Sequence, residues 1–243
     1  MPSLKLKFLK RNRVIYLFFF TVIISVLFDA CNGGLFDRRI SEGIIDYEVS
    51  YPSISPDDML AGLMPSAMSM KFKNNRFNAE LSAGMGMFKT NFISNSNEHN
   101  LINSVKLINK KYATKLDKEA VSKMNEKYSH FYISKLDETK EIAGYKCKKA
   151  LVVFDDVANE SFYVYYTDEI NIKDPNWSNI FKDISGVLLE YQMERYGIMM
   201  KFTAKSVTKA KVEDSEFQLS SDYENLTLAD LEKEINAIFE TFK

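Results

Sequence analysis

The chain has 243 residues, of which 46% are hydrophobic and 13% aromatic, and this is enough apolar material for one full-sized core. Its 32 basic and 33 acidic side chains nearly balance, which excludes a strongly basic nucleic-acid-binding surface. Nine glycines and five prolines exclude a fibrous or low-complexity chain. We therefore predict one folded domain that has no nucleic-acid partner.

Residues 1–30 have the layout of an export signal. Basic residues between Lys5 and Arg13 precede the apolar run VIYLFFFTVIISVLF. A basic segment followed by an apolar run of about 7–15 residues is typical of a secretory signal, whereas a membrane-spanning helix needs roughly 20 apolar residues. The run ends in DACNGG, with Ala30 directly before Cys31. This end resembles a relaxed bacterial lipobox, although Phe28 and Asp29 replace the usual aliphatic and small residues.

The lipobox resemblance implies cleavage before Cys31 and attachment of lipid to that cysteine. We predict a signal peptide at 1–30, an anchor linker at 31–42 and a single domain at 43–243. The membrane would then be a partner through the N-terminal lipid. Because no acidic run follows Cys31, we expect an outer-membrane lipoprotein that faces the periplasm, with surface display as the other option. An uncleaved anchor helix would also leave the chain outside the cytoplasm and tethered.

The first element of the domain is a strand in GIIDYEVSYP, where Ile45, Tyr47 and Val49 alternate with polar residues. SPDDMLAGLMPSAM follows as a capped helical turn or flexible lid. MSMKFKNNRFNAEL predicts a hairpin with its tight turn at Lys73-Asn74-Asn75. GMGMFKTNFIS and NLINSVKLINKKYATKL continue as strands, and residues 117–130 predict a helix.

The second half of the chain predicts further strands at 145–154 and 161–167, and in VLLEYQMER and IMMKFTAKSV around a turn at Gly197. An amphipathic helix at 228–242 ends the chain, with Thr227 as its N-cap. Short alternating strands with turn signals between them predict a mainly β (α+β) fold. We expect a strongly curved antiparallel sheet or half-open barrel, with the helices covering its concave face or closing its mouth.

Three segments carry a family resemblance: ETKEIAGYKCKKALVVF, FYVYYTDEI and FKDISGVLLEYQM. Their order is similar to that in the GLPGLI-type, LolA/LolB-like family of Bacteroidetes periplasmic lipoproteins. DISGVL stands where the GLPGLI motif would, with Asp183 and Ser185 replacing its first glycine and its proline. The resemblance implies a LolA-like half-closed barrel over an apolar cavity and assigns no catalytic residue.

Cys147 lies within one of these segments. If Cys31 carries lipid, Cys147 has no cysteine left to pair with in the chain. We therefore predict that Cys147 is buried as a small hydrophobic residue and is not a reactive thiol. Gly144 and Gly186 fit either the kinks of a bent sheet or ordinary turns.

Methionine is concentrated between residues 59 and 87. Flexible thioether side chains suit an adaptable apolar wall, although plain core packing and a Cu(I) site are alternatives. Met68 with Met70, and Met85 with Met87, are expected to share strand faces. The candidate ligand-binding residues are Met64, Met68, Met70, Met85, Met87 and Phe88.

Histidine is scarce, and HExxH, CxxC, phosphate-loop and G-x-S-x-G motifs are absent from the sequence. We therefore predict that the chain is not an enzyme and needs no cofactor or metal. The expected function is a lipid-anchored carrier of a hydrophobic ligand such as an acyl chain or lipoprotein tail. The alternatives are a structural or interaction lipoprotein that acts through an envelope protein partner, and a methionine-rich copper-binding protein.

Overall fold

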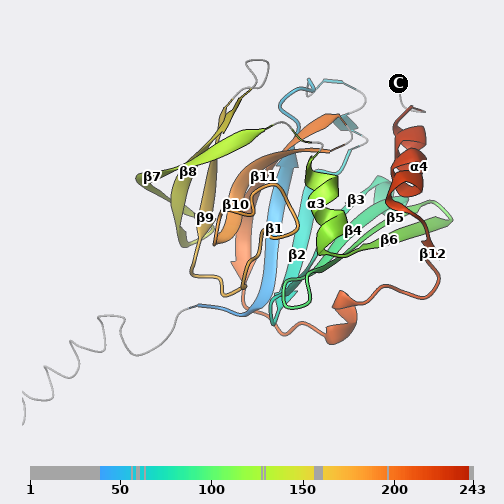
Figure 1. Cartoon of the computed structure of the whole chain (residues 1–243), viewed down its shortest axis with the longest axis horizontal. Helices are drawn as coiled ribbons and strands as arrows, with labels where there is room; N and C mark the ends of the chain where they lie inside the picture. The colour runs from blue at the N-terminus through green and yellow to red at the C-terminus, as the bar shows by residue number, and fades with distance from the viewer. Residues whose placement is uncertain are drawn as a thin grey trace, which may run out of the picture. The chain divides into compact units, whose positions relative to one another are not determined.

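The computed structural model describes residues 39–55, 57–58, 61–62, 64–126, 128, 130–155, 161–195 and 197–240. The predicted signal peptide and Cys31 lie outside these residues. In the described part of the chain, twelve strands form one sheet (Figure 1) in the order β12-β6-β5-β4-β3-β2-β1-β11-β10-β9-β8-β7. None of the described helices is long and apolar enough to cross a membrane.

Most strands that follow one another in the sequence are also neighbours in the sheet. Their bounds are β1 Glu42–Ser50, β2 Ala67–Lys73, β3 Arg76–Ala83, β4 Phe88–Asn95, β5 Asn100–Leu107, β6 Lys110–Leu116, β7 Phe131–Ile142, β8 Tyr145–Phe154, β9 Phe162–Thr167, β10 Val187–Arg195, β11 Ile198–Thr208 and β12 Glu224–Asn225. The helices are the short 3-10 turns η1 Gly84–Gly86 and η2 Asp214–Phe217, and the α-helices α3 Lys118–Glu126 and α4 Leu228–Glu240.

Local sequence signals explain several of these elements. Asn74 and Asn75 join β2 to β3 with φ of 50° and 63°, the left-handed conformation that a tight hairpin turn requires and that asparagine tolerates. The backbone N–H of Asp230 donates to Thr227 Oγ1 at 3.2 Å, and this confirms Thr227 as the N-cap of α4. The predicted first strand is also confirmed, because Ile45, Tyr47 and Val49 are buried on one face of β1.

The main core lies on one face of β1, β2 and β8–β11. The segment between β9 and β10 lies over the same face (Figure 1) and contributes Ile172, Phe181 and Ile184 to this core. Phe181 is fully buried, and its ring lies 6.1 Å from that of Tyr191 on β10. A loop without regular structure therefore supplies a central part of the hydrophobic packing.

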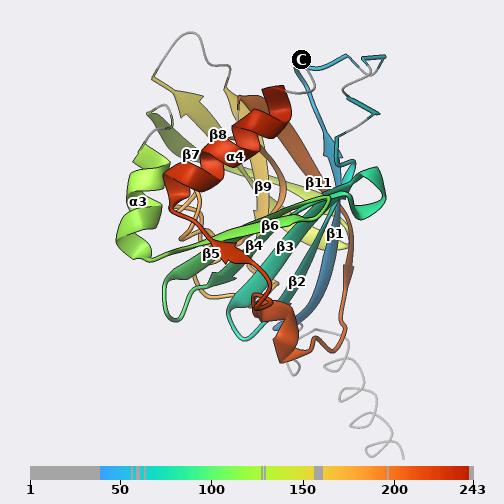
Figure 2. The ribbon, with the colours of Figure 1, turned by 90° about the vertical axis from the view of Figure 1, so that its right-hand side faces the viewer.

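Smaller clusters hold the two α-helices against one end of the sheet (Figure 2). Val121 and Met124 of α3 pack with Leu101 and Leu116. Leu231 and Ile235 of α4 pack with Val105, Phe88 and Tyr112. Both helices therefore cover strands β5 and β6.

The other face of the sheet is crossed by the segment that follows β11. Lys73 Nζ donates to the carbonyl oxygen of Val212 at 3.0 Å, Arg76 pairs with Asp214 at 2.5 Å, and Asn78 Nδ2 donates to the carbonyl oxygen of Glu216 at 2.8 Å. The segment then adds β12 in parallel beside β6. It thus ties β2 and β3 to the far edge of the sheet.

The predicted fold class was wrong beyond its β-rich character. The sheet is open, since β12 and β7 form its two edges and do not pair with each other. The sheet is therefore not closed into a barrel, and the predicted LolA-like fold is not supported beyond a β-rich class. The two α-helices cover only one end of the sheet, because their buried apolar side chains pack on strands β5 and β6.

Candidate functional site

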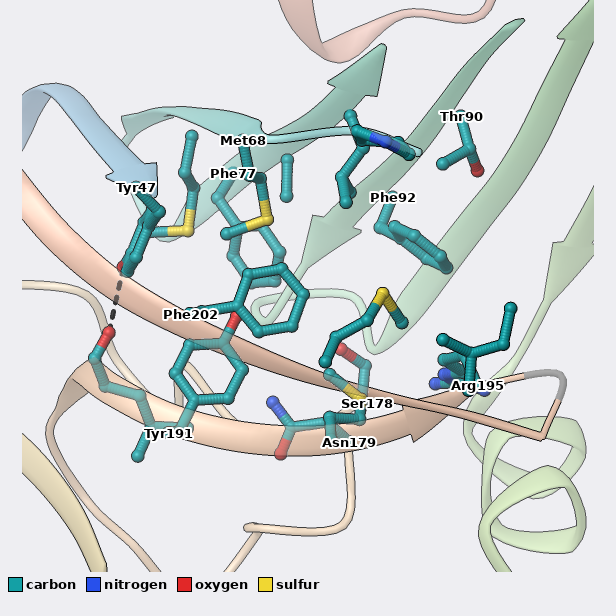
Figure 3. A pocket seen from close by; sticks show the side chains of 18 of the residues that line it. Tyr47, Met68, Phe77, Thr90, Phe92, Ser178, Asn179, Tyr191, Arg195 and Phe202 are labelled. Carbon is teal, nitrogen blue, oxygen red and sulfur yellow. Dashed lines mark hydrogen bonds between the residues drawn. The ribbon is translucent and has the colours of Figure 1, made fainter. Parts of the chain in front are cut away.

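A cavity of about 210 Å³ lies on the core face of the sheet (Figure 3). Its walls come from β1–β5, β10 and β11, from residues before β2, and from the segment between β9 and β10. Its described lining is Tyr47, Tyr51, Met64, Pro65, Met68, Met70, Phe77, Ala79, Leu81, Phe88, Thr90, Phe92, Leu101, Leu107, Pro175, Asn176, Ser178, Asn179, Val187, Leu188, Tyr191, Met193, Arg195, Ile198, Met200 and Phe202.

Strand alternation directs one row of apolar side chains from β10 and β11 into this cavity. Tyr191 pairs with Phe202, and Met193 pairs with Met200. The rings of Tyr191 and Phe202 stack at 4.8 Å with an angle of 14° between their planes. Because paired residues on neighbouring strands share a face, the same register that builds the sheet also builds the cavity wall.

The polar groups around the cavity are largely bonded to the protein itself. Tyr47 OH donates to the carbonyl oxygen of Leu188 at 2.8 Å (Figure 3), and Tyr51 OH donates to that of Pro65 at 2.6 Å. Asn176 Nδ2 donates to the carbonyl oxygens of Ile184 and Gly186 at 2.7 and 2.9 Å. The cavity therefore presents an apolar surface with few polar groups left for a ligand.

Burial also keeps its tyrosines neutral. It raises the pKa of Tyr47 well above its usual value, and the nearby Tyr191 adds to the shift. Burial alone raises the pKa of Tyr191. Both hydroxyls therefore stay protonated at neutral pH.

Arg195 is the only charged residue among the described residues that line the cavity. Its guanidinium lies 5.9 Å from the centre of the Phe92 ring and 5.4 Å from that of Tyr128. Both contacts are within the range of a cation–π interaction. Arg195 thus gives one side of the cavity a positive charge held by aromatic rings.

Residues 79–230, more than half of the chain, match the family described as the N-glycanase peptide, N-terminal domain. The chain belongs to this family. None of the curated proteins matches the chain. The match begins at Ala79 on β3 and includes all of β4–β11, so the N-glycanase N-terminal domain region supplies most of the cavity wall.

This family corrects the predicted function. A non-enzymatic carrier of a hydrophobic ligand conflicts with a domain named for an enzyme, N-glycanase. The prediction that the chain is not an enzyme is contradicted for the same reason. Nor does the match support the structural or copper-binding alternatives, or the LolA-like and GLPGLI descriptions.

Four of the six predicted ligand-binding residues line the cavity: Met64, Met68, Met70 and Phe88. Met85 and Met87 do not, and both side chains are exposed. Their expected place on a strand was wrong, because Gly84–Gly86 form the turn η1 and Met85 has a φ of 52°. The turn directs their side chains away from the wall that Met68 and Met70 form.

Apart from Phe88, the sequence interpretation missed the aromatic part of the cavity. Alternation placed Tyr47 on the correct face of its strand, and Tyr191 lay in a predicted strand, but alternation alone does not say which face borders a cavity. Asn176, Ser178 and Asn179 come from a segment without periodicity, and nothing in the sequence indicated their position.

Cys147 is fully buried, as predicted. Burial raises the pKa of its thiol to about 12, and the thiol donates to the carbonyl oxygen of Tyr145 at 3.5 Å. A protonated, enclosed thiol is a poor nucleophile. Among the described residues, no group of three or more His, Cys, Asp and Glu side chains is placed to hold a metal ion.

Proposed function

We propose that this chain recognises N-glycosylated substrates for an N-glycanase, and that the cavity binds an apolar side chain of the substrate polypeptide. The observation that carries the proposal is a mainly apolar cavity in which the hydroxyls of Tyr47 and Tyr51 and the side-chain amide of Asn176 are already bonded internally. Most of this cavity lies in the region that matches the N-glycanase N-terminal domain.

The chemistry of the cavity favours the polypeptide part of such a substrate over its sugar part. A sugar ring carries several hydroxyls, and burying each hydroxyl without a partner costs about 1–3 kcal/mol. The hydroxyls of Tyr47 and Tyr51 and the amide N–H groups of Asn176 are already donated to backbone carbonyls. An aliphatic or aromatic side chain has no hydroxyl that needs a hydrogen-bond partner, so it can be buried there without this cost.

The size of the cavity supports the same assignment. An engineered apolar cavity of about 150 Å³ takes up benzene, so about 210 Å³ is enough for one aromatic or branched side chain. Burying such a side chain contributes about 1.5–3 kcal/mol. This is a modest contribution, and we expect the cavity to add selectivity to binding that also depends on other contacts.

The experiment uses two synthetic N-glycopeptides that differ only in having Phe or Ser next to the glycosylated asparagine. Calorimetry measures both affinities, because the single tryptophan, Trp177, is not among the residues that line the cavity and its indole N–H donates to Ser94 Oγ at 2.9 Å. We expect the Phe peptide to bind about tenfold more tightly, which corresponds to about 1.4 kcal/mol. Equal affinities for the two peptides, or an undetectable interaction with both, would overturn the proposal.

Two variants locate the interaction. Ala79→Leu, on the cavity wall, fills part of the space and should remove the preference for Phe. Glu80→Gln is the control, because Glu80 is the next residue of β3 and pairs with Lys89 at the surface. Circular dichroism and thermal melting verify that both variants fold, and a preference that survives in Ala79→Leu would exclude the cavity.

We further propose that the domain is exported and anchored in the envelope through lipid on Cys31. The basic segment, the apolar run and the small residue before Cys31 support this proposal. Mass spectrometry of the protein from membranes would show an acylated N-terminal Cys31. A Cys31→Ser variant that remains in the membrane fraction with an intact N-terminus would favour the uncleaved anchor.

A further inference from the structure

The strands β9–β11 carry a second concave feature on the face opposite to the cavity. It is a cleft of about 270 Å³ whose lining includes Tyr163, Tyr165, Glu190, Gln192 and Lys201. We call it the outer cleft. Glu190 and Gln192 flank Tyr191, which lines the cavity, so alternation along β10 sends these side chains to opposite faces.

An exposed aromatic ring borders the outer cleft. Tyr163 is 48% exposed, whereas its neighbours on β9, Phe162 and Val164, are buried on the other face. Lys149 Nζ lies 3.9 Å from the centre of this ring and covers part of it. Tyr165 lies two residues further along β9, with Lys140 Nζ at 4.8 Å from its ring centre. The two lysines hold the rings, and Tyr163 keeps a large accessible surface.

A fixed carboxylate lies beside these rings. Glu190 pairs with Lys140 at 2.7 Å and with Lys201 at 3.1 Å. Partial burial opposes ionisation of Glu190, but hydrogen bonds and attraction from the two ammonium groups outweigh it and lower its pKa. A carboxylate accepts up to about four hydrogen bonds and an ammonium donates three, so the group retains both acceptors and donors for a ligand.

We propose that the outer cleft binds a neutral sugar ring of an N-glycan. The apolar C–H face of the sugar packs on the exposed ring of Tyr163. Its hydroxyls donate to Glu190 and accept from Lys201, while the amide of Gln192 serves as either donor or acceptor.

The charges of the outer cleft favour a neutral ligand over an anionic one. Lys140 and Lys201 share the carboxylate of Glu190, and Lys149 pairs with Glu138 at 2.8 Å. Each ammonium is therefore engaged by a carboxylate of this chain. A phosphate or acidic sugar would have to compete with Glu190, whereas a hydroxyl adds to the existing network.

The assignment of the sugar to an N-glycan rests on the proposed function, because the family supplies that context. The site itself rests on the ring and the polar groups of the outer cleft. It lies on a different face from the cavity that would bind the polypeptide, so the two interactions are separable by mutation.

The experiment measures binding of the free N-glycan core pentasaccharide, which lacks any polypeptide, by saturation-transfer NMR and calorimetry. We expect wild-type protein to bind it and Tyr163→Ala to bind about tenfold more weakly, which corresponds to about 1.4 kcal/mol, because the sugar loses the ring on which its C–H face packs. Gln192→Ala should also weaken binding. Tyr132→Ala is the control, because Tyr132 is a similarly exposed tyrosine, 58% accessible, on β7 outside the cleft.

Two outcomes would overturn the outer cleft as a sugar site: no binding of the pentasaccharide by wild-type protein, or equal losses in Tyr163→Ala and Tyr132→Ala. The cavity variant Ala79→Leu should leave pentasaccharide affinity unchanged. Failure of the Phe peptide to bind, together with retained pentasaccharide binding, would reject the polypeptide site alone, and the reverse pattern would reject the sugar site alone.

Discussion

Strands β10 and β11 serve two different surfaces of this protein. On the core face, Tyr191 stacks on Phe202 and both line an apolar cavity. On the opposite face, Glu190 and Lys201 form an ion pair in the polar outer cleft. The two faces share the same backbone and register, and they differ because successive side chains along each strand point to opposite faces.

The difference separates stability from recognition. Side chains on the core face are buried and pack against one another, so replacing them disturbs the fold and the cavity together. Side chains of the outer cleft are partly solvated, so replacing them should change ligand affinity with little effect on folding. The predictions below test this separation, from the largest expected effect on stability to the smallest.

The largest effect is expected for Phe181→Ala. Phe181 is fully buried, and its ring contacts those of Phe131, Phe162 and Tyr191. Loss of the ring should lower the free energy of unfolding by about 3–5 kcal/mol, because it removes apolar contacts and leaves a cavity. Denaturant unfolding measures the change. A loss below about 1 kcal/mol would show that the segment between β9 and β10 is not part of the cooperative core.

A smaller loss is expected for Gly186→Ala at the start of β10. A Cβ atom there would lie 2.6 Å from the carbonyl oxygen of Thr167, a backbone atom of β9 that has little freedom to move. We expect a loss of about 2–3 kcal/mol and weaker binding at both faces, because β10 must shift away from β9. Thermal melting and the two binding assays measure these effects.

Gly144→Ala is the matched control for this close approach. Gly144 has a φ of 81° in the turn between β7 and β8, and nothing lies within 4 Å of the added Cβ. The left-handed conformation alone should cost about 1 kcal/mol, with binding unchanged at both faces. Equal effects of the two substitutions on binding would contradict the role of Gly186 in positioning β10.

The sequence allowed the strands and turns to be predicted because their signals are local. Alternation marked Ile45, Tyr47 and Val49 as one face of β1, and the Asn74-Asn75 pair marked a tight hairpin. Whether the sheet closes into a barrel or stays open was not predictable in this way. It depends on which edges pair, and the parallel addition of β12 to β6 joins segments more than a hundred residues apart.

The candidate site was predictable in part for the same reason. Met68 and Met70 lie two residues apart on one strand, so their shared face follows from the period of a strand. Met85 and Met87 have the same spacing but belong to a turn. Arg195 and Phe92 come together only through the tertiary fold, and no pattern of spacing records that contact.

The ion pairs of the outer cleft predict a pH-dependent contribution to stability. The pKa of Glu190 is lower in the folded state than the usual value of about 4.3 for glutamate, so its contribution is present above that pH. The contribution is lost as the pH falls through the lower, folded-state pKa. Glu190→Gln should therefore cost about 0.5–1 kcal/mol at neutral pH after solvent screening, and progressively less as the pH falls through the folded-state pKa. Thermal melting of both proteins across this range measures the difference, and a gap that widens in acid would reverse the assigned sign.

The smallest effect on stability, and the sharpest test of the separation, is expected for Tyr163→Ala. Tyr163 alternates with the buried Phe162 and Val164 on β9 and is 48% exposed. Its removal should change the free energy of unfolding by about 0.5 kcal/mol or less, with the lost contact to Lys149 as the main cause. The same variant should lose about tenfold in pentasaccharide affinity. A loss of several kcal/mol in stability would place Tyr163 in the packing of the sheet, and its effect on sugar binding would then follow from unfolding and not from the outer cleft.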